Sequence, residues 1–324
     1  MSDLPKRISI KEEGPREGFQ FEKGVIPAAR KIALIDSLSQ TGLKQIQTVS
    51  FVPAKNVPGM ADADEVVQGF RRAPGVSYTA LWLNERGLER AIDSGKLDIK
   101  GILTLTASEK FLLRNQKRNL AENLAALPGL IAMYKKHEVP VERVSIAAAF
   151  GCNFEGDIPV ATVVDMSRQL VEMGRDYGLD VKVLSLADTM AWATPQSIRR
   201  VVGAVREAFP ELQISLHLHD TRGMGVANAY AGLEMGVAMF DAAVGGLGGC
   251  PFAAHSGAAG NVCTEDLIFM CDEMGIESGV DLEALLETAR LAEDIVGHPL
   301  PGAVKSGGSL RRLRQKIAGE PVVA

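Results

Sequence analysis

Cysteine is scarce in this sequence: only four occur in 324 residues. They form no CxxC pair, and they are too few to build a disulfide framework in a chain of this length. We therefore expect reduced thiols in a cytoplasm-like compartment.

Long hydrophobic runs and clustered basic charge are also lacking. No uninterrupted apolar run reaches the roughly 18 residues of a membrane helix, and the first residues, MSDLPKRISIKEEG, contain no apolar signal-peptide core. We expect a soluble cytoplasmic protein that does not bind membranes. Lys and Arg are spread along a chain of net charge −5, which offers no footprint for nucleic acid. With 46% hydrophobic residues, the composition favours an enzyme-sized globular protein that acts on small molecules.

Short β-rich segments alternate with helical patterns through most of the chain. The eight segments are RISIKE, QIQTVSF, SYTALWL, GILTLTA, RVSIAAAF, VKVLSLAD, QISLHLHD and MFDAAVGG. Segments between them, such as PQSIRRVVGAVREAF, have apolar residues near 3.6-residue spacing. This alternation is typical of a closed parallel barrel, in which each crossover helix covers the preceding strand. We predict an α/β fold, a TIM (β/α)8 barrel with extra C-terminal helices; an open doubly wound sheet is the alternative.

The pattern divides the chain into three regions. Residues 1–275 form the predicted barrel, residues 276–304 form a helical appendage, and residues 305–324 form a basic tail around Arg311, Arg312 and Arg314. We expect the tail to be a solvated or frayed end. Contact of its arginines with phosphate groups is the alternative.

Polar side chains follow four of the predicted strands, where barrel enzymes place their chemistry. Arg16 and Glu17 follow the first strand in GPREGFQ, Asp188 follows the sixth in SLADT, and VGGLGGC follows the eighth. His217 and His219 close the seventh strand, and alternate side chains of a strand share a face. A same-face histidine pair at this rim favours metal binding over simple packing.

Two imidazoles need additional oxygen donors to hold a catalytic divalent ion. Glu17 and Asn261 are the candidates. The loop GGCPFAAHSGAAGN would bring the Asn261 amide and the Cys250 thiol across the barrel mouth. Its glycines also suit flexible turns, and GGLGG is not a dinucleotide fingerprint because no helix begins at its third glycine.

These motifs resemble the hydroxymethylglutaryl-CoA lyase family within the DRE-TIM metallolyase group. GPREGFQFEK, SFVPAKNVPGM, GCNFEG, SLADT, HLHDTRG, VGGLGGCPF, GNVCTEDL and GHPLPG stand in the family's order at comparable spacing. The resemblance implies a TIM barrel and a metal-assisted retro-Claisen cleavage. The substrate would be hydroxymethylglutaryl-CoA or a related branched 3-hydroxyacyl-CoA, and the products acetyl-CoA and a keto acid.

The resemblance also implies a metal centre. His217, His219 and Asn261 match the family's ligand positions, and Glu17 would contribute a further oxygen. Mixed nitrogen and oxygen ligands suit Mg²⁺ or Mn²⁺. The cation would hold the hydroxyl and carboxylate oxygens of the substrate.

Further roles are implied for side chains around the cation. Arg16 would face the thioester oxygen, where negative charge accumulates, and Cys250 would donate a proton to the departing acetyl-CoA carbanion. Asp188 would orient a ligand or share in proton transfer. Three more side chains are expected on the substrate or CoA side: Gln20, Lys23 and Gln47. The implied partner is an acyl-CoA thioester, and we expect a homodimer.

Several positions depart from the family pattern. The family usually has Asp at Glu17, Glu at Gln47 and Tyr at Arg222, and the loop between Cys250 and Asn261 is longer than usual and adds His255. Loss of the carboxylate at residue 47 is expected to lower the negative charge of the site. The acyl group of the substrate therefore stays open.

Two other functions remain open alongside the lyase. A Claisen-type synthase of the citramalate or isopropylmalate kind would use the same barrel. The cysteine in GGLGGCP and the lack of a long C-terminal regulatory region favour the lyase. The third possibility is a non-catalytic CoA- or metal-binding homologue. Such a protein would not need the intact metal-ligand and thiol positions, which argues against it.

Overall fold

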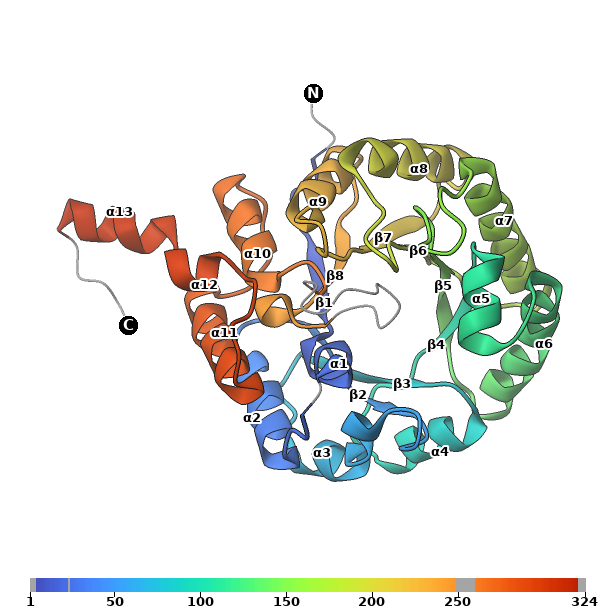
Figure 1. Ribbon diagram of the computed structural model, residues 1–324, viewed down its shortest axis with the longest axis horizontal. Coiled ribbons are helices and arrows are strands. Elements are labelled where there is room, and N and C mark those ends of the chain that lie inside the picture. Colours follow the sequence, from blue (N-terminus) through green and yellow to red (C-terminus); the bar gives the residue numbers. More distant parts are fainter. Residues whose placement is uncertain (1–3, 23, 249–259, 320–324) are drawn as a thin grey trace.

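Parallel strands alternate with helices along the chain in the computed structural model, which describes residues 4–22, 24–248 and 260–319 (Figure 1). The strands are β1 (Ser9–Glu12), β2 (Gln45–Phe51), β3 (Ser77–Trp82), β4 (Gly101–Thr106), β5 (Val141–Ala147), β6 (Val183–Ala187), β7 (Gln213–His217) and β8 (Met239–Ala242). All eight predicted strands are present. The seventh ends at His217, so His219 lies just beyond it.

The strands form one sheet in the order β3-β2-β1-β8-β7-β6-β5-β4. The first and last strands are therefore neighbours, and Lys11 of β1 pairs with Asp241 of β8. The sheet curls around until its end strands, β3 and β4, lie on the same side of a ring with helices outside it (Figure 1). Between these two strands, the described residues form no ladder. This architecture is the predicted TIM barrel.

The outer layer consists of amphipathic helices that follow the strands. They are α2 (Ala28–Leu38), α3 (Ala63–Gly69), α4 (Glu85–Asp93), α5 (Glu109–Gln116), α6 (Leu120–Lys136), α7 (Val160–Asp176), α8 (Pro195–Ala208), α9 (Gly225–Glu234) and α10 (Thr264–Glu273). Helix α8 shows why they form here. Its first position is Pro195, and the Thr194 side chain caps the Ser197 N–H at 3.2 Å. Apolar residues at helical spacing bury its inner face: Ile198, Val201, Val202 and Val205.

Short helical turns lie at the carboxyl ends of the strands. They are η1 (Gly14–Gly18), α1 (Phe19–Phe21), η2 (Pro58–Met60) and η3 (Val244–Gly246). The turns η1 and η3 follow the neighbouring strands β1 and β8, so the first and last strands of the barrel bring them together.

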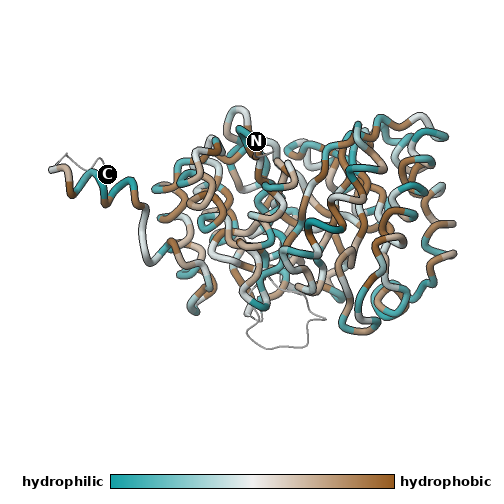
Figure 2. Tube along the Cα trace, turned by 90° about the horizontal axis from the view of Figure 1, so that it is seen from above, coloured by the Kyte–Doolittle hydropathy of each residue, from teal (hydrophilic) through white to brown (hydrophobic). Residues whose placement is uncertain are grey.

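Three helices follow the barrel: α11 (Leu282–Val296), α12 (Val304–Gly307) and α13 (Leu310–Ala318). Helix α11 lies beside α2, where the hydroxyl oxygens of Ser37 and Thr288 are 2.7 Å apart. Helix α13 projects from the barrel (Figures 1 and 2), and most of its residues are exposed, so this end is solvated as expected but helical rather than frayed. The Ser309 cap and the ion pair of Arg314 with Glu273 at 2.7 Å stabilise it. Among the described helices, none has the length and apolarity that crossing a bilayer requires.

Candidate active site

The turn η1 after β1 carries Arg16 and Glu17. It is a single π-helical turn with proline near its start, and the Glu17 N–H donates to the Glu13 carbonyl at 2.7 Å. Such turns occur often at functional sites. The turn directs the Glu17 carboxylate toward β7.

The buried carboxyl group of Glu12 holds the start of this turn. Glu12 accepts hydrogen bonds from the Gly14 N–H at 2.8 Å, the Val244 N–H at 2.9 Å and the Thr264 hydroxyl at 2.6 Å. Burial raises the pKa of Glu12 to about 7 although these three donors oppose the rise. A Cβ at Gly14 would lie 2.6 Å from the Glu12 Oε1, so the close approach requires glycine. Glu12 thereby joins the start of the barrel to η3 and α10, which follow the last strand.

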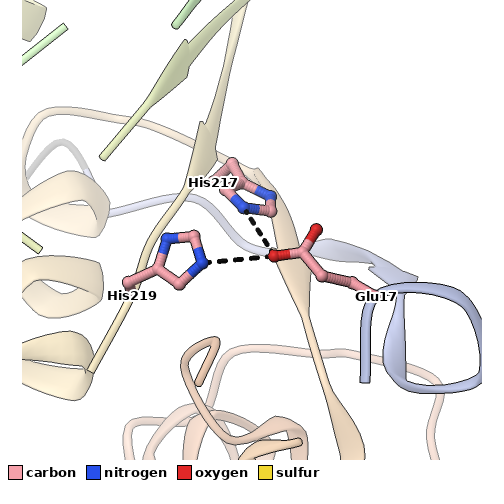
Figure 3. Close-up of side chains that lie close together, drawn as sticks. All are labelled: Glu17, His217 and His219. Carbon is pink, nitrogen blue, oxygen red and sulfur yellow. Dashed lines mark hydrogen bonds and ion pairs between the residues drawn. The ribbon is translucent and has the colours of Figure 1, made fainter. Parts of the chain in front are cut away.

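Glu17, His217 and His219 converge on one point (Figure 3). The Glu17 Oε1 lies 3.2 Å from the His219 Nε2 and 3.7 Å from the His217 Nε2. One ligand atom from each of the three residues lies within 4.8 Å of the other two. This spacing suits ligands gathered around one cation.

The other nitrogen of each imidazole is already engaged. The His219 Nδ1 lies 2.9 Å from the Asp188 carbonyl oxygen, and the His217 Nδ1 lies 3.3 Å from the Asp241 Oδ2. A carbonyl oxygen only accepts hydrogen bonds, so the His219 Nδ1 carries a proton. In the neutral tautomer, its Nε2 lone pair points toward Glu17. Such outer partners orient metal-binding histidines in general.

Asn261 completes the candidate ligand set. A backbone bridge places it beside His219, and its Nδ2 donates to the Glu17 Oε1 at 3.2 Å. Its Oδ1 is buried and has no hydrogen-bond partner among the described residues. Because a buried oxygen without a partner is costly, this atom fits a cation. Two imidazoles with carboxylate and amide oxygens form a donor set suited to Mg²⁺ or Mn²⁺.

The electrostatics of the centre also suit a cation. Burial by itself lowers the pKa of His217, but the Glu17 carboxylate and the hydrogen bond to Asp241 outweigh burial and raise this pKa to about 10. The Glu17 and Asp241 carboxylates thus favour the charged form of the imidazole. A bound divalent ion would displace this proton and leave the imidazole deprotonated for coordination.

Arg16 lies beside the candidate metal ligands and is held by three groups. Its Nη1 lies 3.0 Å from the Glu17 Oε2, its Nη2 donates to Glu13, and its Nε donates to the Gln47 Oε1. Burial opposes the charged form, but Glu13 and then Glu17 outweigh burial and raise the pKa of Arg16. The guanidinium is a fixed positive charge in this site.

A charged cluster in the barrel interior was missed by the sequence analysis. The Lys11 Nζ lies 2.5 Å from Glu13 and 3.1 Å from Asp241, and the Arg143 Nη1 lies 3.7 Å from the Asp241 Oδ1. Glu13 joins Glu17 as a carboxylate contact of Arg16, so two carboxylates face the guanidinium although residue 47 carries an uncharged amide. Charged residues inside the apolar segments RISIKE, RVSIAAAF and MFDAAVGG are the signal that could have revealed the cluster.

The Asp188 side chain turns toward its own loop. Its Oδ1 accepts hydrogen bonds from the Trp192 N–H at 2.7 Å and the Ala193 N–H at 3.0 Å, while its Oδ2 is buried without a partner among the described residues. Burial raises the pKa of Asp188 to about 6. Arg222 holds the same loop by donating to the Ala191 carbonyl at 2.8 Å. Asp188 therefore orients His219 through its backbone, and its carboxyl retains one free oxygen.

Of the remaining predicted site residues, the structure describes Gln20 but not Lys23 or Cys250. Gln20 lies beside β2, where its Oε1 accepts a hydrogen bond from the Ser50 hydroxyl at 3.2 Å. Lys23 and Cys250 lie outside the described residues, as does His255.

Comparisons with known proteins point to one family. The HMGL-like family model matches residues 7–292. Hydroxymethylglutaryl-CoA lyase YngG of Bacillus subtilis (strain 168) is 40% identical over 297 residues, which cover 92% of this chain and 96% of that protein. The mitochondrial hydroxymethylglutaryl-CoA lyase of Gallus gallus is 40% identical over 285 residues, with 88% and 92% of the two chains covered.

Comparison with solved structures points to the same family. The crystal structure of the Bacillus subtilis HMG-CoA lyase matches with a TM-score of 0.85 and 39% identity, covering 94% of this chain and 98% of that one. An HMG-CoA lyase from Acinetobacter baumannii, in complex with coenzyme A and 3-methylmalate, matches with a TM-score of 0.83 and 34% identity, covering 94% and 96%. With the family model spanning most of its length and these relatives matching nearly end to end, the chain belongs to the HMGL-like family.

Proposed function

We propose that this protein is a carbon–carbon lyase that cleaves a 3-hydroxyacyl-CoA to acetyl-CoA and a keto acid with the help of Mg²⁺ or Mn²⁺. Its relatives are hydroxymethylglutaryl-CoA lyases, which yield acetyl-CoA and acetoacetate. The observation that carries the proposal is the convergence of Glu17, His217 and His219 beside the unpaired Asn261 oxygen.

The proposed cation site supplies the first part of the chemistry. Glu17, His217, His219 and Asn261 would hold the ion. When bound, it would supply Lewis acidity at the hydroxyl group of the substrate and lower the barrier to removing the hydroxyl proton. Asp188 is proposed to share in the proton transfer, because its buried Oδ2 is free and its pKa is about 6.

Arg16 is proposed to stabilise the charge that develops during cleavage. As the carbon–carbon bond breaks, its electron pair passes to the acetyl-CoA fragment and negative charge accumulates on the thioester oxygen. The guanidinium is already charged and held by Glu13, Glu17 and Gln47, so it need not reorganise during the reaction. We propose Cys250 as the proton donor to the resulting carbanion, with Gln20, Lys23 and Gln47 on the substrate or CoA side.

The location and the assembly state are also proposals. The sequence has only four cysteines and no CxxC pair, which suits a reducing cytoplasm. For the assembly state, we expect a homodimer. Light scattering on the purified protein measures the assembly state directly, and a monomer would contradict the second proposal.

Incubation with a panel of branched 3-hydroxyacyl-CoA thioesters, including hydroxymethylglutaryl-CoA, tests the function. We expect acetyl-CoA and the matching keto acid in the presence of Mg²⁺ or Mn²⁺, and loss of the reaction with EDTA. Release of free CoA from acetyl-CoA and a keto acid would instead identify a synthase. Lack of turnover with every thioester would favour the non-catalytic homologue.

A further inference from the structure

We infer that Glu13 is a positioning residue for the proposed lyase reaction, because its carboxylate holds the Arg16 guanidinium in place from the position directly after the first strand of the barrel. The inference rests on the proposed function for its kinetic consequences. Its structural basis is the set of contacts that Glu13 makes.

Glu13 joins Arg16 to the barrel wall. One carboxylate oxygen accepts from the Arg16 Nη2, and the other lies 2.5 Å from the Lys11 Nζ. Lys11 in turn lies 3.1 Å from Asp241, its register partner on β8. The Glu13 side chain is only 2% exposed, so solvent screens these contacts little. Two paired strands therefore fix the carboxylate that holds Arg16.

The other partners of Arg16 cannot take over this role. The Glu17 carboxylate is shared between Arg16, both histidines and Asn261, and it is the proposed metal ligand. Gln47 accepts from the Arg16 Nε through an uncharged amide, which offers no opposite charge to the guanidinium. Glu13 is thus the charged partner of Arg16 outside the proposed ligand set.

Glu13 also supplies negative charge to the interior of the barrel. Among the described side chains there, the cations Lys11, Arg16 and Arg143 contact the carboxylates of three residues, namely Glu13, Glu17 and Asp241. Loss of the Glu13 charge would leave Arg16 with Glu17 as its remaining carboxylate contact among the described residues. The guanidinium would then be free to leave the position in which Glu13 holds it.

A double-mutant cycle between residues 13 and 47 tests the inference. We expect Glu13→Gln to lower kcat by about ten- to a hundredfold, since misplacing a group by about an ångström can cost that much. The dissociation constant for Mn²⁺ should change much less than kcat. Gln47→Glu added to Glu13→Gln should recover most of the lost kcat, because it returns a carboxylate to the Arg16 Nε. A merely structural role for Glu13 would not produce this rescue.

A second readout is independent of turnover. Phenylglyoxal modifies arginine side chains, and mass spectrometry measures its rate at Arg16 in the metal-free protein. The rate should rise several-fold in Glu13→Gln and fall again in the double variant. If Glu13→Gln does not fold, Glu13→Asp keeps the charge, shortens the reach to Arg16 and should show the same two effects.

The outcomes separate the two proposals. A wild-type protein without lyase activity would refute the proposed function, while the modification rates would still decide whether Glu13 holds Arg16. Wild-type kcat and wild-type modification rate in Glu13→Gln would overturn the inference. A double variant no better than Glu13→Gln would overturn it as well.

Discussion

Arg16 and Glu17 are adjacent in the chain, and their side chains form an ion pair with the Arg16 Nη1 3.0 Å from the Glu17 Oε2. The other oxygen of Glu17 faces His219 at 3.2 Å. One candidate metal ligand, Glu17, thus lies between a fixed guanidinium and the His219 imidazole. The proposed cation and the proposed stabiliser of negative charge are thereby held close together.

The first prediction concerns the cation. We expect crystals soaked in Mn²⁺ to show an anomalous peak between Glu17, His217, His219 and Asn261. His219→Ala should weaken Mn²⁺ binding by at least about a hundredfold, because even outer partners of ligands contribute ten- to a hundredfold. His137→Ala is the matched control: it removes a histidine from a surface group with Glu85 and should leave the affinity unchanged. Lack of a peak would refute the site.

The second prediction concerns the thiol. Cys250→Ser should lower kcat by about two orders of magnitude, the scale of general acid catalysis, without changing the dissociation constant for Mn²⁺. Stopped assays of acetyl-CoA formation measure the first quantity and calorimetry the second. Cys271→Ala, which changes a buried thiol in α10, should keep wild-type turnover. Full activity of Cys250→Ser would show that this thiol is not the proton donor.

The third prediction concerns the pH dependence of stability. Glu265 accepts a hydrogen bond from the Gly245 N–H at 3.0 Å, and burial raises its pKa from 4.5 to about 7. The folded protein therefore retains a proton that the unfolded chain loses, so the free energy of unfolding should fall as pH rises between these values. The fall is about 1.4 kcal/mol per pH unit for such a group. Urea denaturation in EDTA should show a shallower fall for Glu265→Gln than for wild type. Equal slopes of the free energy of unfolding against pH in the two proteins would contradict a raised pKa for Glu265.

The fourth prediction concerns the C-terminal helix. Removal of residues 309–324 deletes α13, whose contacts include the ion pair of Arg314 with Glu273 near the surface. Such pairs contribute about 0–1 kcal/mol. We expect Tm to fall by only about 2–4 °C and kcat to stay unchanged. A large loss of either would show that the tail is part of the functional unit, against the proposed division of the chain.

The sequence predicted the residues at the strand ends better than those inside the strands. Arg16, Glu17, His217 and His219 follow or close apolar segments, and parallel strands end at one rim of a barrel, so their convergence was predictable. Asn261 was a candidate oxygen donor on the loop after the eighth strand, and the family resemblance supported it. The division at residues 275 and 304 remains a proposal.

The interior cluster was not predictable in the same way. A charged residue within a strand ordinarily indicates a solvent-exposed position. Only pairing of the first strand with the last places Lys11 of β1 against Asp241 of β8. The helical tail was missed because its arginines were interpreted by charge alone, although Leu310, Leu313 and Ile317 recur near helical spacing.

The separation of Glu17 and Asn261 along the chain has a consequence during protein synthesis. These residues are 244 positions apart, yet the Asn261 Nδ2 donates to the Glu17 Oε1. A nascent chain that has not reached residue 261 lacks part of the proposed ligand set, even if its earlier strands have already paired. The proposed metal centre would therefore be completed only after nearly the whole barrel has left the ribosome, and tight cation binding would mark a chain synthesised beyond residue 261.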